Sequence, residues 1–484
     1  MRIVGLSPGA QVHLVGIGGA GLSAIARVLM GAGYRVSGSD RQASALTEAL
    51  QAEGATVYIG HRADQVRGAD LVIVSSAVPP DNPEVVAARE AGIPVVKRDR
   101  VLGAMMADRV GLAVAGTHGK TTTTAMIATV LLAAGLDPTF IVGGVLVGPE
   151  TNARYGGGPH FVIEADEYDH TFLGLRPQVS VVTNVEHDHP DCYPSYEEMV
   201  DAFTAFVRLL PPEGRLVLCA DDPGAMGLAA AWEGEVITYG LGEGAPTGPR
   251  CGPHWQATDL KRNERGGFDF TVRVDGEPLG RMSLLVPGRH NVQNSLAALA
   301  VTTGQGVPFD QAARVLADYR GTRRRFEIKG VVRGVTVVDD YAHHPTEVRA
   351  TLAAARARYG RRTPIWAVFQ PHTYSRTRVL LDDFPAALVE ATHVLVLPIY
   401  AAREPEDPTV RVEEIVAGMP YHDARVVADF EEAVEQLLAG VSPGDVVITL
   451  GAGDGYRVGE MLLERLRDRD SVFRGSGSTG EGGG

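Results

Sequence analysis

The residues best suited to chemistry form a glycine-rich segment near residue 120. Its sequence is Gly116-Thr117-His118-Gly119-Lys120-Thr121, and Thr122 to Thr124 follow it. An apolar run at 110–115 precedes it and a helical pattern follows. Its glycines would therefore bring backbone N–H groups and a helix N-terminus against a chain of phosphates. Lys120 would reach the terminal phosphates and Thr121 would bind Mg²⁺. The alternative is a chance glycine-rich turn, because Val114 stands where the common eight-residue pattern has its first glycine.

Two polar segments follow later apolar runs and could hold a metal ion. Glu164-Ala165-Asp166-Glu167 comes directly after 161–163. Carboxylates at the C-terminal end of a strand beside a phosphate loop are placed to bind Mg²⁺. The segment 184–192 contains His187, His189 and Cys192, but no fourth ligand stands at a spacing typical of zinc. One histidine that assists a second Mg²⁺ is the better interpretation.

A second glycine-rich turn lies near the N-terminus. Gly16-Ile17-Gly18-Gly19-Ala20-Gly21 matches G-x-G-x-x-G between a strand and a helix, and Asp40 ends the next expected strand. The pattern indicates a site for a pyrophosphate, so any nucleotide linked through a diphosphate would fit, from a nicotinamide cofactor to a UDP-sugar. A tight turn that binds no ligand is the alternative.

Four further segments stand where open α/β folds place ligands or where domains meet. Asn291 and Asn294 share a helix face and could bind phosphate or a base edge, or belong to an N-terminal capping segment. The arginines at 323–325 could be a solvated hinge or could clamp a phosphate or carboxylate. The segments 339–345 and 370–377 each end a strand, at the edge of the sheet where such folds bind ligands.

Short apolar runs alternate with helical patterns along the whole chain, which predicts βαβ units and parallel sheets. We expect an α/β protein of three domains: a Rossmann-like domain at 1–108, a phosphate-loop domain at 109–320 and a second Rossmann-like domain at 321–470. The pattern from 236 to 286 is rich in strands and turns and predicts a small sheet appended to the central domain. The glycine- and serine-rich end, 471–484, is expected to be a disordered tail.

Composition excludes several classes of protein. The net charge is −14, from 45 basic and 59 acidic residues, which argues against a general nucleic-acid binder. No apolar stretch is long enough to span a membrane, and the N-terminus lacks the apolar core of a signal peptide. The three cysteines are sparse and unpaired in sequence, which fits a reducing compartment. We therefore expect a cytoplasmic protein, either a monomer or a weak homodimer.

Together these motifs resemble the Mur ligase family over nearly the whole chain. In order they are Gly-Thr-His-Gly-Lys-Thr-Thr-Thr, Glu-Ala-Asp-Glu, Asn-Val-x-His-Asp-His, His-Asn-x-x-Asn, Arg-Phe-Glu and Asp-Asp-Tyr-Ala-His-His-Pro. Two more segments, 16–23 and 369–377, resemble most the branch that adds L-alanine to UDP-N-acetylmuramate. The resemblance implies a UDP-binding, an ATP-binding and an amino-acid-binding domain.

The resemblance also implies roles for single residues. Gly116, Thr117, His118, Gly119, Lys120, Thr121, Thr122, Asn291 and Asn294 would bind ATP; Thr121, Glu164 and His189 would hold Mg²⁺; Gly18, Gly19, Gly21, Asp40 and Ser75 would face the UDP moiety; Tyr341, His343, His372 and Arg376 would contact L-alanine; and Lys120, Arg325, Asp340 and His343 would be catalytic. Several relatives carry a carbamylated lysine between two metals. No lysine stands between Lys120 and Lys261, and the alanine-adding branch lacks that lysine too.

The implied reaction is ATP-dependent formation of an amide bond. ATP would convert the lactyl carboxylate of UDP-N-acetylmuramate into an acyl phosphate, which the amine of L-alanine attacks, with His343 as the hypothetical base. A ligase of murein recycling, which adds a tripeptide to the same sugar, is the close alternative. More distant alternatives are a nicotinamide-dependent dehydrogenase and a nucleotide-binding switch protein that does not turn over.

Overall fold

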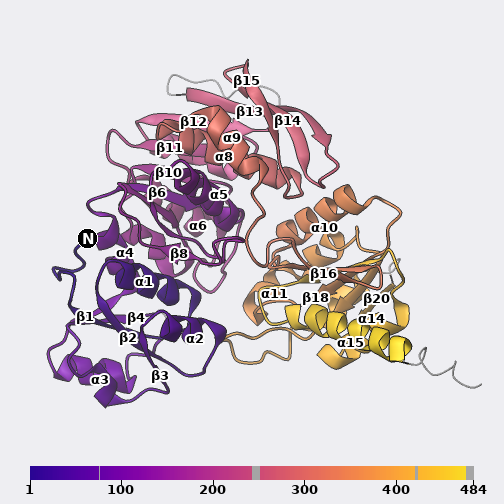
Figure 1. The fold of residues 1–484 in the computed structure, drawn as a ribbon, viewed down its shortest axis with the longest axis horizontal. Helices are drawn as coiled ribbons and strands as arrows, with labels where there is room; N and C mark the ends of the chain where they lie inside the picture. Colours follow the sequence, from indigo (N-terminus) through magenta and orange to yellow (C-terminus); the bar gives the residue numbers. More distant parts are fainter. Residues whose placement is uncertain (76, 243–250, 420–422, 476–484) are drawn as a thin grey trace, which may run out of the picture. The chain divides into compact units, whose positions relative to one another are not determined.

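The computed structural model describes residues 1–75, 77–242, 251–419 and 423–475. The chain forms two compact units. The first unit consists of Met1–Lys261, Asp269–Leu284 and Asn291–Thr322, and the second of Arg262–Phe268, Leu285–His290 and the chain from Arg323 onward. Within each unit, helices cover the faces of the sheets (Figure 1).

The N-terminal part of the first unit is a five-stranded parallel sheet in the order β3-β2-β1-β4-β5. Its strands are β1 (Gln11–Val15), β2 (Arg35–Asp40), β3 (Thr56–Ile59), β4 (Leu71–Val74) and β5 (Val95–Lys97); its helices are α1 (Ala20–Gly31), α2 (Ala45–Ala52), η1 (Ala63–Val66), α3 (Pro83–Glu90) and α4 (Arg98–Met106). The central strand β1 is almost wholly buried, because helices cover both faces of a parallel sheet. The expected Rossmann-like arrangement is confirmed.

The central part of the first unit is a ten-stranded sheet in the order β15-β14-β13-β12-β11-β10-β6-β9-β7-β8. The strands are β6 (Val110–Ala115), β7 (Thr139–Ile141), β8 (Ala153–Arg154), β9 (His160–Glu164), β10 (Val179–Val182), β11 (Arg215–Cys219), β12 (Glu235–Gly240), β13 (Cys251–Arg262), β14 (Phe268–Val274) and β15 (Glu277–Ser283). The helices are α5 (Lys120–Ala133), η2 (Tyr168–Gly174), α6 (Tyr196–Val207), α7 (Pro223–Gly227), η3 (Leu228–Ala231), α8 (Arg289–Gly304) and α9 (Phe309–Ala317).

One expectation about this sheet is corrected. The strand-rich region from 236 to 286, expected as a small sheet appended to the central domain, instead continues the central sheet. Strand β13 pairs in parallel with β12, and the antiparallel hairpin of β14 and β15 continues the same sheet outward. Unpaired backbone groups at the edge of β12 would otherwise need another partner, and β13 provides it.

The second unit contains a six-stranded sheet in the order β16-β17-β21-β18-β19-β20. Its strands are β16 (Glu327–Val332), β17 (Val335–Asp340), β18 (Ile365–Phe369), β19 (His393–Val396), β20 (Asp423–Val426) and β21 (Val446–Leu450), and only β16 runs antiparallel. Its helices are α10 (Pro345–Tyr359), α11 (Tyr374–Leu380), η4 (Leu381–Asp383), α12 (Phe384–Ala387), α13 (Val412–Ala417), α14 (Phe430–Gly440) and α15 (Tyr456–Gly475). Apolar clusters on both faces of the sheet form its core.

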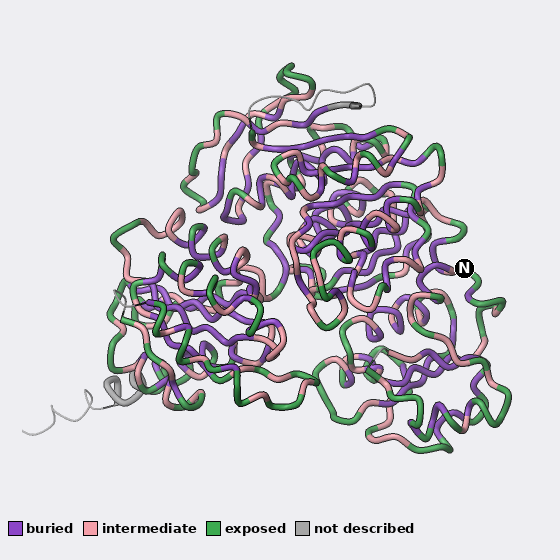
Figure 2. Tube along the Cα trace, turned by 180° about the vertical axis from the view of Figure 1, so that it is seen from behind, coloured by how far each residue is buried: buried purple, intermediate pink, exposed green. Residues whose placement is uncertain are grey.

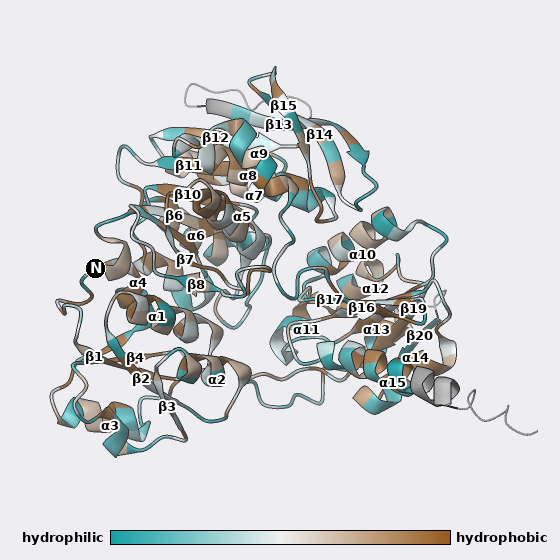
Figure 3. Ribbon diagram, viewed as in Figure 1, coloured by the Kyte–Doolittle hydropathy of each residue, from teal (hydrophilic) through white to brown (hydrophobic). Residues whose placement is uncertain are grey.

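Burial and hydropathy follow the same arrangement in each unit. The central strands of the sheets are buried in Figure 2 and apolar in Figure 3, as expected for sheets covered on both faces, whereas edge strands such as β3, β15 and β16 are mostly exposed or half-buried. Helix α15 extends to Gly475, so the expected tail does not begin at residue 471. Residues 476–484 lie outside the described part of the chain. No helix among the described residues is long and apolar enough to cross a membrane.

A buried ionic network holds the end of β2 beside the first glycine-rich turn. The carboxylate of Glu84, on α3, is fully buried and lies 2.7 Å from His13 Nε2 and 2.8 Å from His61 Nδ1. Ser39 donates a hydrogen bond to the same carboxylate at 2.8 Å. Burial alone would raise the pKa of Glu84, but the contacts with His13, Ser39 and His61 outweigh it and hold the pKa below its usual value. The network therefore stabilises the fold when Glu84 is ionised.

We predict that Glu84→Gln lowers the stability of the first unit at pH 7.5 by about 1–3 kcal/mol, because buried hydrogen bonds to a charged group are lost. A carboxyl group with a lowered folded pKa stabilises above its unfolded pKa of about 4.3. The difference from the wild type should therefore shrink as the pH falls below that value. Thermal unfolding across a pH series measures it, with Glu53→Gln as the control because Glu53 is exposed and pairs with Arg27 at the surface. Equal melting temperatures for wild type and Glu84→Gln at pH 7.5 would contradict the prediction.

Candidate active site

The segment Gly116 to Gly119 joins β6 to the N-terminus of α5, as expected for a phosphate loop. Gly116 has φ +129° and Gly119, the N-cap of α5, has φ +82°, conformations that favour glycine. A Cβ atom on Gly116 would lie 2.0 Å from Thr183 Oγ1, and one on Gly119 would lie 2.8 Å from Asn294 Oδ1. Both positions therefore require glycine, for conformational and for steric reasons.

Lys120 lies at the start of α5 and is held by its own loop and by one buried carboxylate. Its Nζ atom donates hydrogen bonds to the carbonyl oxygens of Gly116 at 2.5 Å and Thr117 at 3.0 Å, and to Glu167 Oε1 at 2.8 Å. Burial alone would lower the pKa of Lys120, but the carboxylates of Glu167 and Glu164 outweigh it and raise that pKa. Lys120 is therefore positively charged at neutral pH.

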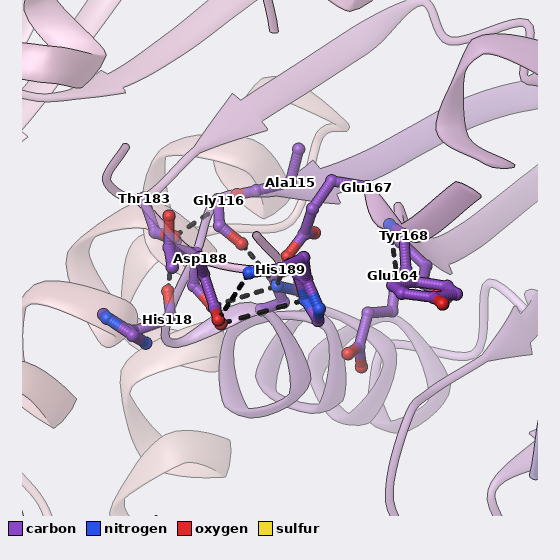
Figure 4. A network of polar contacts seen from close by, with 12 residues as sticks. Ala115, Gly116, His118, Glu164, Glu167, Tyr168, Thr183, Asp188 and His189 are labelled. Carbon is purple, nitrogen blue, oxygen red and sulfur yellow. Dashed lines mark hydrogen bonds and ion pairs between the residues drawn. The ribbon is translucent and has the colours of Figure 1, made fainter. Parts of the chain in front are cut away.

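Glu167 is the central acidic group of this cluster. Its side chain is only 1% exposed, and its Oε1 atom lies 3.5 Å from His189 Nε2 as well as close to Lys120. Burial alone would raise the pKa of Glu167, but the charge of Lys120 and the hydrogen bond to His189 keep that pKa lowered. Figure 4 shows the carboxylates of Glu167 and Asp188 around the side chain of His189. One buried carboxylate thus positions both the lysine and a histidine.

The residues expected to hold a metal ion are partly brought together. Thr121 Oγ1 donates to Glu164 Oε1 at 3.1 Å, and the other oxygen of Glu164 accepts from the backbone N–H of Gly143 at 2.6 Å. A hydroxyl and a carboxylate form an oxygen donor set of the kind that Mg²⁺ prefers. His189, with a strained φ of +53°, contacts Glu167 and Asp188.

The rest of the expected nucleotide site packs around the same loop. Asn291 and Asn294 are buried on α8, Asn294 donates to Asn291 at 3.1 Å, and Asn294 contacts Gly119. The backbone N–H of His118 donates to Asn184 Oδ1 at 2.8 Å, and its carbonyl oxygen accepts from Thr183 Oγ1 at 2.5 Å. Thr122 is half-buried on α5.

The glycine-rich turn of the first sheet is held by the end of β2. The carbonyl oxygen of Ser39 accepts from the N–H groups of Gly16 and Ile17, at 2.8 and 3.0 Å. Gly18 N donates to Asp40 Oδ2 at 2.9 Å, so this carboxylate supports the turn itself. Gly19 is the N-cap of α1, Gly21 lies in its first turn, and Ser75 Oγ lies 3.4 Å from a Cβ atom built on Gly16. The expected UDP-facing residues therefore surround one turn.

The residues expected to contact the amino acid form one cluster in the second unit. The rings of Tyr341 and His343 meet edge to face at 5.5 Å, and His343 lies 5.6 Å from His372. Arg376 Nη1 is 2.9 Å from His372 Nδ1, and Arg325 lies over the ring of Tyr341 at 5.2 Å. Three segments thus converge, and two of them, 339–345 and 370–377, stand at strand ends of the sheet edge, as predicted.

Within this cluster, the ring of His343 has a defined orientation. Its Nδ1 atom lies 3.0 Å from the carbonyl oxygen of Tyr341 and 3.3 Å from Glu347. A carbonyl can only accept, so Nδ1 carries the proton and Nε2 is the acceptor nitrogen of the neutral ring. Glu347 also lies 3.4 Å from Arg325. The ring is therefore prepared to accept a proton through Nε2.

Asp340 lies in the same region, and its carboxylate accepts hydrogen bonds from backbone N–H groups. Its two carboxylate oxygens accept from the N–H groups of Phe326 and Ala342, each at 2.9 Å. Burial raises the pKa of Asp340 to about 6, against the lowering effect of the charge on Arg325. These contacts orient the segment that follows β17 and give Asp340 a positioning role in this structure.

Several residues of the site were missed by the sequence analysis. Glu167, Thr183, Asn184 and Glu347 stand inside or next to the motifs, but their spacing does not distinguish them from neighbours. Glu167 could have been found, because a phosphate-loop lysine in an apolar site needs a buried anion and the motif offers few.

The fold and the site define a class of protein before any comparison is made. A phosphate loop with a charged lysine, a glycine-rich diphosphate turn and an arginine–histidine cluster on separate α/β sheets define a multidomain enzyme that uses nucleotides. Three successive domain families match the chain: Mur ligase family, catalytic domain, at 11–110; Mur ligase middle domain at 114–302; and Mur ligase, glutamate ligase domain, at 324–453. The chain belongs to the Mur ligase family.

Similar proteins of known name cover nearly the full length. UDP-N-acetylmuramate–L-alanine ligases of Geotalea daltonii and Roseiflexus sp. are 43% and 45% identical to it; each alignment covers 95% of this chain and 98% or 99% of the relative. The crystal structure of UDP-N-acetylmuramate-alanine ligase from Thermotoga maritima matches with a TM-score of 0.80 and 30% identity, over 95% of this chain and 99% of that one. A murein peptide ligase from Psychrobacter arcticus shares the fold at 24% identity, with a TM-score of 0.70, over 95% of this chain and 99% of that one. The family assignment removes the dehydrogenase interpretation of the glycine-rich turn.

We predict that Gly119→Ala weakens the binding of a nucleoside triphosphate by about tenfold or more, because the new methyl group displaces Asn294 from the loop. Gly135→Ala is a matched control. Gly135 follows the other end of the same helix with φ +75° and has nothing within 4 Å of its Cβ position. Both variants should lose about 1 kcal/mol or more of stability from the left-handed backbone, and only Gly119→Ala should lose affinity. Fluorescent ATP titration with thermal unfolding separates the two effects, and equal affinities would contradict the prediction.

Proposed function

We propose that this protein joins L-alanine to the lactyl carboxylate of UDP-N-acetylmuramate, with ATP as the energy source, in the synthesis of peptidoglycan precursors. The observation that carries the proposal is the buried Lys120–Glu167 pair beneath the phosphate loop, in a chain whose relatives of that name match almost end to end. A charged lysine at the start of α5 suits a transferring phosphoryl group.

The proposal assigns one ligand to each domain. The domain at 1–108 binds the UDP moiety around Gly18, Gly19 and Gly21, and the domain at 109–320 binds ATP around Lys120. The domain at 321–470 binds L-alanine; Tyr341, His343, His372 and Arg376 contact it. The substrates are soluble nucleotides and a free amino acid, so we place the reaction in the cytoplasm, with no nucleic acid or membrane partner and a monomer or weak homodimer as the active form.

Mg²⁺ is the proposed metal, and the residues present fit it. Thr121 and Glu164 offer a hydroxyl and a carboxylate that already contact each other, and His189 stands near the same loop as the third proposed ligand. When bound with ATP, a divalent cation neutralises charge on the phosphates. The buried Oε2 atom of Glu167 has no hydrogen-bond partner among the described residues, which leaves an acceptor for water or a ligand in this region.

The first half of the reaction makes the carboxylate reactive. A carboxylate oxygen attacks the γ-phosphorus of ATP, ADP leaves, and an acyl phosphate forms. Negative charge on the transferring group is stabilised by Lys120 and by the backbone N–H groups at the start of α5. Lys120 must leave the carbonyl oxygens of Gly116 and Thr117 to do so, while Glu167 keeps its charge in place.

The second half forms the amide bond. The neutral amine of L-alanine attacks the acyl carbon, phosphate leaves, and one amine proton must be removed. His343 is the proposed base, because its Nδ1 atom is held by Tyr341 and Glu347 and its Nε2 atom is the acceptor. Arg376 and Arg325 supply positive charge for the carboxylate of the amino acid and for the departing phosphate.

We predict that phosphate release from ATP requires Mg²⁺, UDP-N-acetylmuramate and L-alanine together. Release is measured with each component omitted in turn, and the product is identified by mass as UDP-N-acetylmuramoyl-alanine. Phosphate release that requires the UDP-sugar and a tripeptide, but not L-alanine, would indicate the ligase of murein recycling instead. Release that ignores the UDP-sugar would contradict the ligase proposal.

We also predict that His343→Gln lowers the rate of coupling at saturating L-alanine by about 100-fold or more, while ATP affinity stays within about twofold. His393→Gln is the control, because His393 stacks on Trp366 and pairs with Asp423 away from this cluster. A variant that recovers the full rate at high L-alanine would show that His343 only binds the amino acid. An unchanged rate at every concentration would remove His343 from the site.

A further inference from the structure

The guanidinium group of Arg98 lies against the first glycine-rich turn, and Arg98 was not among the expected site residues. Arg98 is the first residue of α4, and α4 lies near α1 in the same unit (Figure 1). A Cβ atom built on Gly21 would lie only 2.9 Å from Arg98 Nη1. The third glycine of G-x-G-x-x-G therefore leaves room for an arginine, in addition to the close packing that such a glycine allows.

The hydrogen bonds of Arg98 are made from only one side of the guanidinium. Nη2 donates to Asp166 Oδ2 at 2.9 Å and to Thr171 Oγ1 at 3.0 Å, both in the central part of the first unit. Nε is buried and has no hydrogen-bond partner among the described residues. Nη1 likewise donates to no described protein acceptor and points to the turn. The side chain of Arg98 is 19% exposed, so an acceptor that arrives with a ligand can reach Nη1.

The surroundings of Nη1 favour a negatively charged acceptor. Helix α1 begins beside it with Gly19 as N-cap, no side-chain cap and no acidic residue in its first turn. The N–H groups of that turn and the positive end of the helix dipole therefore face the same space as the guanidinium. The nearby carboxylate of Asp40 accepts from the backbone N–H of Gly18. Neighbouring Lys97 is exposed and pairs with Asp169, so it does not supply this charge.

From this geometry we infer that Arg98 binds the diphosphate of the nucleotide-sugar substrate and is a specificity-determining residue for it. The inference rests on the proposed function, which requires a UDP-linked substrate at this turn. Arg98 donates from Nη1 to a diphosphate oxygen while Nη2 keeps its bond to Asp166. The same side chain thus fixes the diphosphate relative to the acidic segment 164–167 beside the phosphate loop.

The test compares UDP with uridine, because the two differ only in the diphosphate. Binding of each to the full-length protein is measured by calorimetry. The wild type should bind UDP more tightly than uridine. Arg98→Ala should weaken UDP binding by about 10- to 100-fold and leave uridine within about twofold. Arg98→Lys keeps the charge but not the planar fork, and an intermediate loss is expected.

Two controls separate ligand binding from a structural role. Arg100→Ala removes an exposed arginine from the same helix and should leave both affinities unchanged. Asp166→Asn removes the ion pair but leaves Nη1 in place, so UDP affinity should stay within about threefold of the wild type. Thermal unfolding of every variant shows whether it is folded. If Arg98→Ala does not fold, Arg98→Lys decides the outcome.

The outcomes are distinct. Loss of the UDP advantage in Arg98→Ala but not in Asp166→Asn supports the inference. An unchanged UDP affinity in folded Arg98 variants, an equal loss for uridine, or the same loss in Asp166→Asn would overturn it. If the wild type binds UDP no better than uridine, both the proposed function and the inference fail. This outcome is decided by the wild type alone.

Discussion

The structure of the central domain depends on keeping one positive charge inside a largely buried loop. Lys120 must be charged to act on phosphate, yet burial alone favours its neutral form. The buried carboxylate of Glu167 resolves this conflict, because the pair keeps both groups ionised before any ligand arrives. The glycines of the loop, the strained His189 and the contacts of Thr183 then arrange the backbone around this pair.

The parallel sheets explain why so many separate segments meet at the sites. The residues after β6, β9 and β10 lie at one edge of the central sheet, because the carboxyl ends of parallel strands share an edge. The same rule gathers His343 and His372 in the second unit, after β17 and β18, which β21 separates. Each loop contributes only a few polar groups, and the rigid strands beneath hold them in register.

Much of this could be predicted from the sequence, and the reasons for the rest are physical. Strand β6 begins and ends where the apolar run at 110–115 predicted, since a strand buried on both faces appears in the sequence as a continuous apolar run. The continuous ten-stranded sheet could not be foreseen, because the pairing of β13 with β12 depends on backbone groups and not on side-chain pattern. The role of Asn184 likewise follows only from its distance to His118, a residue far from it in sequence.

The two glycine-rich motifs illustrate what such patterns contain. Each specifies a backbone path that lets N–H groups approach phosphate, and that path is common to many nucleotides. Selectivity for one nucleotide has to come from side chains that other elements bring to the turn. The spacing in sequence between such a side chain and the turn does not identify it. Arg98 lies beside Gly21 through packing of α4 against the rest of the unit, whereas Asp40, which the motif does predict, supports the turn itself. A motif can therefore identify where a phosphate binds, while the packed neighbours determine which molecule carries it.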